Sequence, residues 1–148
     1  MRRTFRILMI AIVCFLSGVI AANAGDEKPI NVNDLPAQAQ ALLSDCFKNQ
    51  KVMLATMESG IVSKNYDVVL QDGTKLEFDK KGNLTEVDCK HGIVPSQLVP
   101  QPIKHFLKNY YEGQSVRKIE IKKKGYEFEL ANGLDLTFDK HFKLTDVD

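Results

Sequence analysis

The stretch GTKLEFDKKGNLTEVD, residues Gly73–Asp88, occurs a second time as GLDLTFDKHFKLTDVD, residues Gly133–Asp148. When both copies are extended upstream to Tyr66 and Tyr126, they align without a gap, and eleven of the twenty-three aligned residues are identical. Self-similarity at a fixed spacing indicates that one structural unit is built twice. The fold predicted for the whole chain therefore follows from this repeated stretch.

Apolar and polar residues alternate along each copy, which is the period of a strand with one buried face. Asp72-Gly73 and Asn132-Gly133 each separate two such strands. We expect type I′ hairpin turns at these pairs, because both central residues of that turn need positive φ. The alternating apolar residues are Tyr66, Val68, Leu70, Leu76 and Phe78 in the first copy, and Tyr126, Phe128, Leu130, Leu136 and Phe138 in the second.

Two more strands are expected in each half. One precedes the hairpin, over residues 51–57 and 115–122, and one follows it, over residues 84–88 and 144–148. Each half thus predicts four strands in succession, and the short connections between them favour antiparallel pairing.

An amphipathic helix precedes the strands in both halves. Pro36 and Pro100 lie near the predicted helix starts, where a missing N–H is tolerated because first-turn N–H groups have no intrahelical partner. Asn49-Gln50 and Gly113-Gln114 are expected to close the helices. The spacing i, i+3, i+4, i+7, i+8 of one helix face is occupied by Ala39, Leu42, Leu43, Cys46 and Phe47, and by Ile103, Phe106, Leu107, Tyr110 and Tyr111.

The predicted fold class is α+β, with two tandem units that each contain a helix and a four-stranded antiparallel sheet. The first unit covers residues 33–89 and the second residues 98–148, with a linker over residues 90–97 and a flexible start over residues 25–32. One unit of about sixty residues would be only marginally stable alone, so we expect the two to associate. The sequence leaves open whether the sheets join edge to edge or pack separately.

The first twenty-four residues have the composition of a secretory signal peptide. Three arginines precede an apolar run from Ile7 to Ile20, and Ala22-Asn23-Ala24 forms a typical cleavage site. Cleavage before Gly25 leaves 17 basic and 19 acidic residues, a net charge near −2. This balance argues against nucleic acid and anionic membrane surfaces as partners. The expected location of the mature chain is periplasmic or secreted.

Two cysteines remain in the mature chain, Cys46 on a predicted helix and Cys89 just past the first copy of the repeat. An oxidising compartment would permit a disulfide between them. Cys46 could equally be a small buried apolar residue, and the sequence does not give the Cα separation that a disulfide requires. Neither cysteine lies in a C-x-x-C spacing or beside an activating base, which argues against redox and nucleophilic roles.

Carboxylates at the strand ends raise the question of a calcium site. The loop after Asp79 carries lysines where a calcium loop has further carboxylates, and Phe142 replaces Gly82 in the second copy. We expect Asp79 and Asp139 to cap turns through hydrogen bonds to backbone N–H groups instead, and we predict no metal site and no cofactor. The carboxylates weighed here are Asp79, Glu86, Asp88, Asp139, Asp146 and Asp148.

Signatures of catalysis are missing from the sequence. His91, His105 and His141 have no zinc-like spacing, and no Ser-His-Asp arrangement recurs in both halves. We therefore expect no enzymatic activity.

The repeated pattern, with Leu-Pro at the helix start, Y-x-V/F-x-L-x-D/N-G-x-x-L-x-F-D-K in the hairpin and L-T-x-V-D at the end, resembles the secreted PepSY-like proteins of the beta-lactamase-inhibitor-like fold in Bacteroidetes. The resemblance covers about residues 33–148, although Leu84 and Leu144 occupy a position that is often Trp in that family. It implies a helix-on-sheet module of the periplasm or beyond, without established catalytic residues. It also implies binding to another protein, since relatives are linked to restraining peptidases and other enzymes.

The solvent face of the sheet is the predicted binding surface. Our hypothesis is an exported, non-catalytic module that contacts another envelope or secreted protein or peptide, with inhibition as one form of such binding. The alternative is a cell-envelope protein that binds a small ligand or a metal ion. Mixed charge also keeps an ordinary exposed sheet soluble. The candidate residues are Val69, Lys75, Glu77, Lys118, Glu120, Glu127, Glu129, Asp135 and Thr137, with Lys122 beside them.

Overall fold

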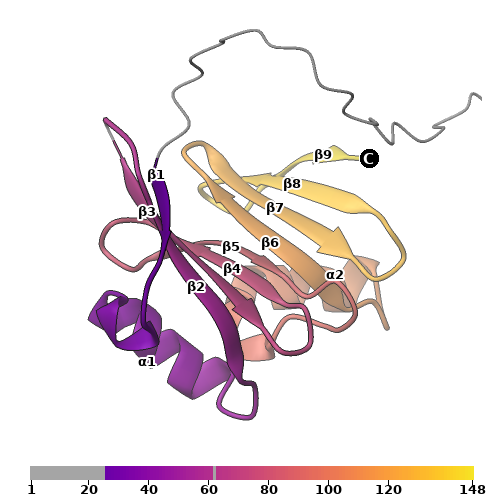
Figure 1. Ribbon diagram of the computed structural model, residues 1–148. Coiled ribbons are helices and arrows are strands. Elements are labelled where there is room, and N and C mark those ends of the chain that lie inside the picture. The colour runs from indigo at the N-terminus through magenta and orange to yellow at the C-terminus, as the bar shows by residue number, and fades with distance from the viewer. Residues whose placement is uncertain (1–25, 62) are drawn as a thin grey trace, which may run out of the picture.

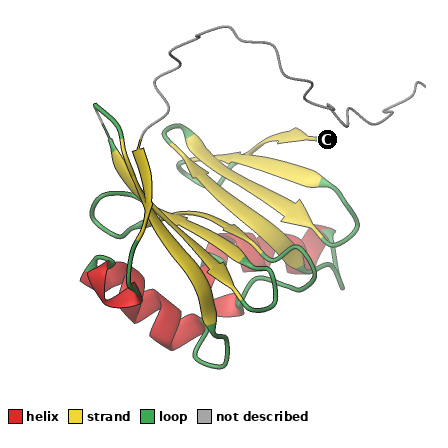
Figure 2. Cartoon of the chain, viewed as in Figure 1, coloured by secondary structure: helices red, strands yellow, loops and turns green. Residues whose placement is uncertain are grey.

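The computed structural model describes residues 26–61 and 63–148, and the predicted signal peptide lies outside them. In this part of the chain, nine strands form one antiparallel sheet in which each strand pairs with its sequence neighbours. Helices α1 (Ala37–Cys46) and α2 (Gln101–Tyr110) lie against one face of the sheet, so the molecule has two layers (Figures 1 and 2). The strands are β1 (Asp26–Pro29), β2 (Val52–Ser59), β3 (Lys64–Leu70), β4 (Lys75–Phe78), β5 (Leu84–Asp88), β6 (Val116–Lys122), β7 (Gly125–Leu130), β8 (Asp135–Asp139) and β9 (Leu144–Val147).

The sheet runs without a break through both halves of the chain. The α+β class is confirmed, and the structure answers the question that the sequence left open: the strands of the two halves join edge to edge in one sheet, because β5 pairs directly with β6. The core is a single cluster that contains buried residues from both helices and from strands of both halves. By pairing, β5 and β6 each supply hydrogen-bond partners for backbone N–H and C=O groups that would be unpaired if both strands were edges.

The N-terminal segment differs from the flexible start predicted for residues 25–32. Residues 26–29 form β1, which pairs with β2 in the register Pro29↔Thr56. The Ile30 N–H continues the ladder by donating to the carbonyl oxygen of Ala55 at 2.9 Å. The outer edge of β2 orders this segment, because it offers backbone groups that would otherwise lack a protein partner.

The linker predicted over residues 90–97 packs closely on the sheet. Val94 is buried, and its N–H donates to the carbonyl oxygen of Val116 at 2.8 Å. The Arg117 guanidinium donates to the carbonyl oxygen of Lys90 at 2.8 Å. A short 3-10 helix, Ser96–Leu98, then leads into α2. These contacts hold the start of α2 against the first strand of the second half.

The two predicted hairpins form, but the type I′ turn is wrong. Gly73 and Gly133 both have φ of 87°, whereas among the described non-glycine residues only Phe142 has positive φ. In the first hairpin the Gly73 N–H donates to the Leu70 carbonyl oxygen at 3.0 Å. The Asp72 carboxylate accepts the N–H two residues further on, as Asx turns do, which suits a type I turn followed by a left-handed glycine.

The helices match the predicted apolar pattern except at Tyr110. Ala39 and Leu43 on α1, and Ile103 and Leu107 on α2, are buried. Tyr110, the last residue of α2, is 70% exposed. Both helices end before the predicted stop residues, while Pro36 and Pro100 occupy the N-cap positions.

Gly125 marks a close approach between β7 and β8. A Cβ atom at this position would lie 1.9 Å from the carbonyl oxygen of Phe138. We expect Gly125→Ala to lower the free energy of unfolding by about 1–3 kcal/mol, as overpacking does, in urea denaturation followed by circular dichroism. Gly92→Ala is the control, since nothing lies within 4 Å there, and it should change stability by less than about 0.5 kcal/mol. Equal effects of the two substitutions would contradict this interpretation.

Candidate binding surface on the open face of the sheet

Neither helix covers the other face of the sheet, which we call the open face (Figures 1 and 2). Alternation along β3 buries Tyr66 and Val68 in the core and directs Asp67 and Val69 to the other face. The same alternation in the other strands places all nine predicted residues on this open face. They are Val69 on β3, Lys75 and Glu77 on β4, Lys118 and Glu120 on β6, Glu127 and Glu129 on β7, and Asp135 and Thr137 on β8.

The strand register brings five carboxylates of the open face side by side. Asp67 lies opposite Glu77, Glu77 opposite Glu86, Glu86 opposite Glu120, and Glu120 opposite Glu127. We call these five residues the acidic row. Like charges in directly opposed positions of a sheet are destabilising. The acidic row is therefore an arrangement that folding alone does not favour.

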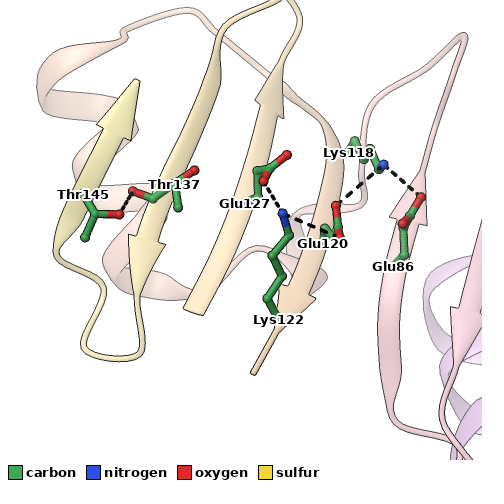
Figure 3. A network of polar contacts seen from close by, with 7 residues as sticks. All are labelled: Glu86, Lys118, Glu120, Lys122, Glu127, Thr137 and Thr145. Carbon is green, nitrogen blue, oxygen red and sulfur yellow. Dashed lines mark hydrogen bonds and ion pairs between the residues drawn. The ribbon is translucent and has the colours of Figure 1, made fainter. Parts of the chain in front are cut away.

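Two lysines balance one end of the acidic row. The Lys118 Nζ lies 3.0 Å from a carboxylate oxygen of Glu86 and 4.0 Å from one of Glu120, and Lys122 contacts both Glu120 and Glu127 (Figure 3). Burial works against the charged form of Lys118, but the hydrogen bond and attraction of Glu86 raise its pKa. The hydrogen bond to Glu127 likewise raises the pKa of Lys122.

Asp67 and Glu77 form the other end of the acidic row. Within residues 26–61 and 63–148, no ion pair reaches Asp67 or Glu77. Partial burial raises the pKa of Asp67, and the charges of Glu27, Glu58 and Glu86 raise it further. Partial burial also raises the pKa of Glu77, with added repulsion from Glu86 and Asp67 that the attraction of Lys118 offsets only in part. Asp67 and Glu77 are therefore the two carboxylates of the acidic row without an ion pair in this part of the chain.

A neighbouring row on the same face is mostly balanced. Lys75 lies opposite Asp88, Asp88 opposite Lys118, and Lys118 opposite Glu129. Like charges meet in this row where Glu129 lies opposite Asp135. Opposite charges in facing positions stabilise a sheet. The contrast shows that the acidic row is a distinct feature and not the general pattern of the open face.

Asp67 and Glu86 are the members of the acidic row that the sequence analysis did not include in the binding surface. The alternation around Asp67 is a sufficient signal for its place on the open face. Glu86 was weighed only as a calcium ligand, and its place in the row depends on the β5–β6 register, which has no local signal in the sequence.

The strand-end carboxylates serve turns, as predicted. One oxygen of Asp79 accepts the N–H groups of Lys81 at 2.8 Å and Asn83 at 3.0 Å, and Asp139 accepts the equivalent two N–H groups. Partial burial would raise the pKa of Asp79, but a hydrogen bond from the Asn83 side-chain amide, together with these two backbone bonds, lowers it. The backbone hydrogen bonds from Lys143 and His141 lower the pKa of Asp139 in the same way. Among the described residues, no group of three His, Cys, Asp or Glu side chains is placed to hold a metal ion.

The two cysteines are not linked in this structure, but they line the same cavity. This cavity has a volume of about 340 Å³ and lies between the end of α1, the β3–β4 turn and the linker. Burial raises the pKa of the Cys46 thiol and of the Cys89 thiol. A raised pKa disfavours the thiolate, which is the nucleophilic form of cysteine. The disulfide between them stays a prediction.

Comparison with known proteins identifies the family. Residues 64–146 match the family described as "Putative beta-lactamase-inhibitor-like, PepSY-like". The chain belongs to this PepSY-like family, and the resemblance stated from the sequence is confirmed. No curated protein matches the chain.

Solved structures of Bacteroides proteins share the fold. A "putative periplasmic protein" from Bacteroides vulgatus is 45% identical with a TM-score of 0.81, over 83% of this chain and 97% of that chain. A "putative calcium-regulated periplasmic protein" from Bacteroides thetaiotaomicron is 45% identical with a TM-score of 0.79, over 82% and 96%. A second Bacteroides vulgatus protein, of unknown function, is 37% identical with a TM-score of 0.78, over 83% and 99%.

These relatives confirm the predicted location, periplasmic or secreted. In the part of the chain that the structure describes, neither helix has the length and apolar character needed to span a membrane.

Replacing Glu77 tests the electrostatic cost of the acidic row. A raised pKa means that the folded state binds this proton more readily than the unfolded chain, so stability falls as the pH rises through that pKa. We expect Glu77→Gln to raise the free energy of unfolding at pH 7 by about 0.2–1 kcal/mol. The gain should disappear below about pH 4, where the carboxyl group is protonated in both states. Urea unfolding of both proteins as a function of pH measures this difference in the free energy of unfolding.

Glu112→Gln is the matched control, because this exposed residue follows α2 and lies outside the acidic row. It should change stability by less than about 0.5 kcal/mol. High salt should reduce the effect of Glu77→Gln, since screening weakens repulsion between exposed charges. A wild-type protein more stable than Glu77→Gln at pH 7 would show that the row is not repulsive.

Proposed function

We propose that the protein is an exported, non-catalytic binding module that holds a basic protein or peptide on its open sheet face. The acidic row carries this proposal, because it gathers five carboxylates in register and leaves Asp67 and Glu77 without an ion pair among the described residues. Lysine or arginine side chains of a partner would neutralise this charge. Complementary charge of this kind directs association and selects partners.

The shape of the surface supports a macromolecular partner. The acidic row crosses five strands, from β3 to β7, and such a broad sheet suits the extended contact of a protein interface. Small-molecule substrates instead occupy concave pockets that bury most of their surface. Membership of a family described as inhibitor-like favours one specific form of binding, in which the open face blocks the working surface of an enzyme.

We further infer that the molecule consists of two copies of one unit, residues 33–89 and residues 98–148, each with a helix and four strands. Matching strand registers support this inference. Val52 lies opposite Leu70 and Val116 opposite Leu130, and an irregularity follows at the same place in both strand pairs. The copies differ on the open face, with Glu77 in one and Thr137 in the other, so the unbalanced charge belongs to the first copy.

Charge reversal on the open face tests the proposed function. Immobilised mature protein should retain basic proteins from a periplasmic extract, and the double variant Glu77→Lys/Glu129→Lys should retain much less, because it turns attraction into repulsion. Quantitative mass spectrometry of the retained proteins is the measurement.

The matched control is Asp45→Lys/Glu112→Lys, which changes the net charge equally on exposed residues at the ends of the helices. It should retain the same proteins as the wild type. The binding site would lie elsewhere if both double variants lost the retained proteins equally, or if Glu77→Lys/Glu129→Lys retained as much as the wild type.

A second candidate function is binding of a small amphipathic ligand. An apolar cavity of about 370 Å³ lies between the linker and the C-terminal half of α2, lined by Val94, Leu107 and Tyr111 among others. Lys104 and Lys108 also line it, so an anionic group at one end of an apolar ligand would find a cation. The metal-ion alternative comes from the name of the Bacteroides thetaiotaomicron relative, which is described as calcium-regulated. Among the described residues of this chain, no group of three His, Cys, Asp or Glu side chains is placed to bind a metal ion.

Calorimetry separates this second candidate from the first. Dodecanoate, a simple anionic amphiphile, should give a saturable heat with the wild type if the cavity is a ligand site. Lys104→Ala/Lys108→Ala should weaken binding at least tenfold, because both cations at the cavity are removed. Calcium, titrated in parallel, should give no heat. Unchanged dodecanoate binding by the double variant would exclude the cavity lysines from the site.

A further inference from the structure

The junction between β5 and β6 shows how two edges of this fold pair. Glu86 lies opposite Glu120 and Val87 opposite Ile119, and the Cys89 N–H donates to the Arg117 carbonyl oxygen at 2.9 Å. Val87 is fully buried as a result. The outer edge of β5 thus supplies both backbone hydrogen bonds and an apolar side chain to its neighbour.

The chain contains two further edges of the same kind. β9 repeats the sequence of β5 except that Asp146 replaces Glu86, so Val147 corresponds to Val87. β2 corresponds to β6, because its register with β3 repeats the register of β6 with β7: Ala55↔Val68 matches Ile119↔Phe128. The outer edge of β9 and the outer edge of β2 are therefore equivalent to the two edges that join inside the molecule.

The outer edge of β9 is open in the part of the chain that the structure describes, where β9 pairs only with β8. Asp148 and Asp135 exchange two backbone hydrogen bonds, at 3.0 and 2.9 Å, so the N–H of Val147 points away from β8. The Val147 side chain is 43% exposed, whereas its counterpart Val87 is fully buried. A neighbouring strand would cover this apolar side chain and use this N–H.

The outer edge of β2 is covered by β1, which imitates the end of β5. Pro29 lies opposite Thr56 as Glu86 lies opposite Glu120, and Ile30 hydrogen-bonds to Ala55 where Val87 faces Ile119. β1 has only four residues, and all of them are exposed. Short exposed edge strands open at low free energy, so β1 can leave β2 more easily than an inner strand can leave its two neighbours.

We propose that β1 is a removable cover, and that the edge of β2 beneath it accepts β9 of a second copy of this chain. Val147 of one copy would then lie opposite Ala55 of the other, and Asp146 opposite Thr56, as the β5–β6 register dictates. The second copy is the occupant that the structure favours, because β9 carries the sequence that already pairs with the equivalent edge inside the molecule.

The contact between copies is weaker than the internal junction. Asp148 would face Leu54, where Asp88 faces Lys118 within the chain. A few strand residues also bury less than the ~1,200 Å² that marks stable interfaces. The contact is head-to-tail, so it propagates into short chains as the concentration rises. It uses sheet edges and not the open face, so it stands or falls independently of the proposed function.

Two proline substitutions on β1 form a matched test. The Ile30 N–H points to β2, and alternation along the strand directs the Lys28 N–H to β2 and the Glu27 N–H away from it. Lys28→Pro therefore breaks the β1–β2 ladder, while Glu27→Pro leaves it intact. Size-exclusion chromatography with light scattering measures the mass in solution. The mass of the Lys28→Pro variant should rise with concentration towards at least twice the mass of one chain. Glu27→Pro should behave like the wild type.

A second pair of substitutions on β9 identifies the other edge. Val147→Pro removes the outward N–H without touching the β8 ladder and should return Lys28→Pro to the mass of one chain. Val147→Ala keeps that N–H and should leave the association in place. A Lys28→Pro variant that keeps the mass of one chain at all concentrations overturns the proposal, as does association that survives Val147→Pro.

A labelled peptide of residues 143–148 gives a test that does not depend on the folding of Lys28→Pro. Fluorescence anisotropy should show saturable binding of this peptide to the wild-type mature chain, limited by the opening of β1. The same peptide with proline in place of Val147 should bind at least tenfold more weakly. Absence of binding, or equal binding of both peptides, contradicts the proposal.

Discussion

Backbone pairing between β5 and β6 is the interaction on which the rest of the molecule depends. It joins two halves that would each be marginal in size, and it places Val87 and Ile119 side by side over a shared core. It also sets Glu86 opposite Glu120. The junction therefore extends the acidic row from Glu86 in the first half to Glu120 and Glu127 in the second, and the hydrogen bonds that join the halves also bring these like charges together.

The acidic row opposes stability, because it sets like charges opposite one another. Lys118 and Lys122 neutralise the carboxylates near the centre of the sheet (Figure 3). Among the described residues no ion pair reaches Asp67 or Glu77, and Lys75, on the same strand as Glu77, lies opposite Asp88. Local rules that a protein breaks without a structural gain tend to mark functional sites. The first half is therefore the more informative place to look for a partner.

Periodicity predicted most of the fold and the open face, because apolar alternation from Tyr66 to Phe78 is a local signal. The features it missed are not local. The β5–β6 register joins residues from different halves, and β1 is a short charged segment without alternation that is ordered only by the edge of β2. The turn type was predicted wrongly for another reason. The Asp72 side chain accepts a hydrogen bond from the backbone, and in this turn only Gly73 has positive φ.

Edge chemistry and surface charge meet at the two ends of the sheet. A repeat whose last strand pairs with the first strand of the next copy has no intrinsic stopping point, and β1 supplies one by occupying the equivalent edge. If β9 of another copy took that place, its Asp146 would lie beside Thr56, which faces Asp67. The acidic rows of successive copies would then form one longer surface, and a partner with several basic sites would bind an assembled chain more tightly than a single copy.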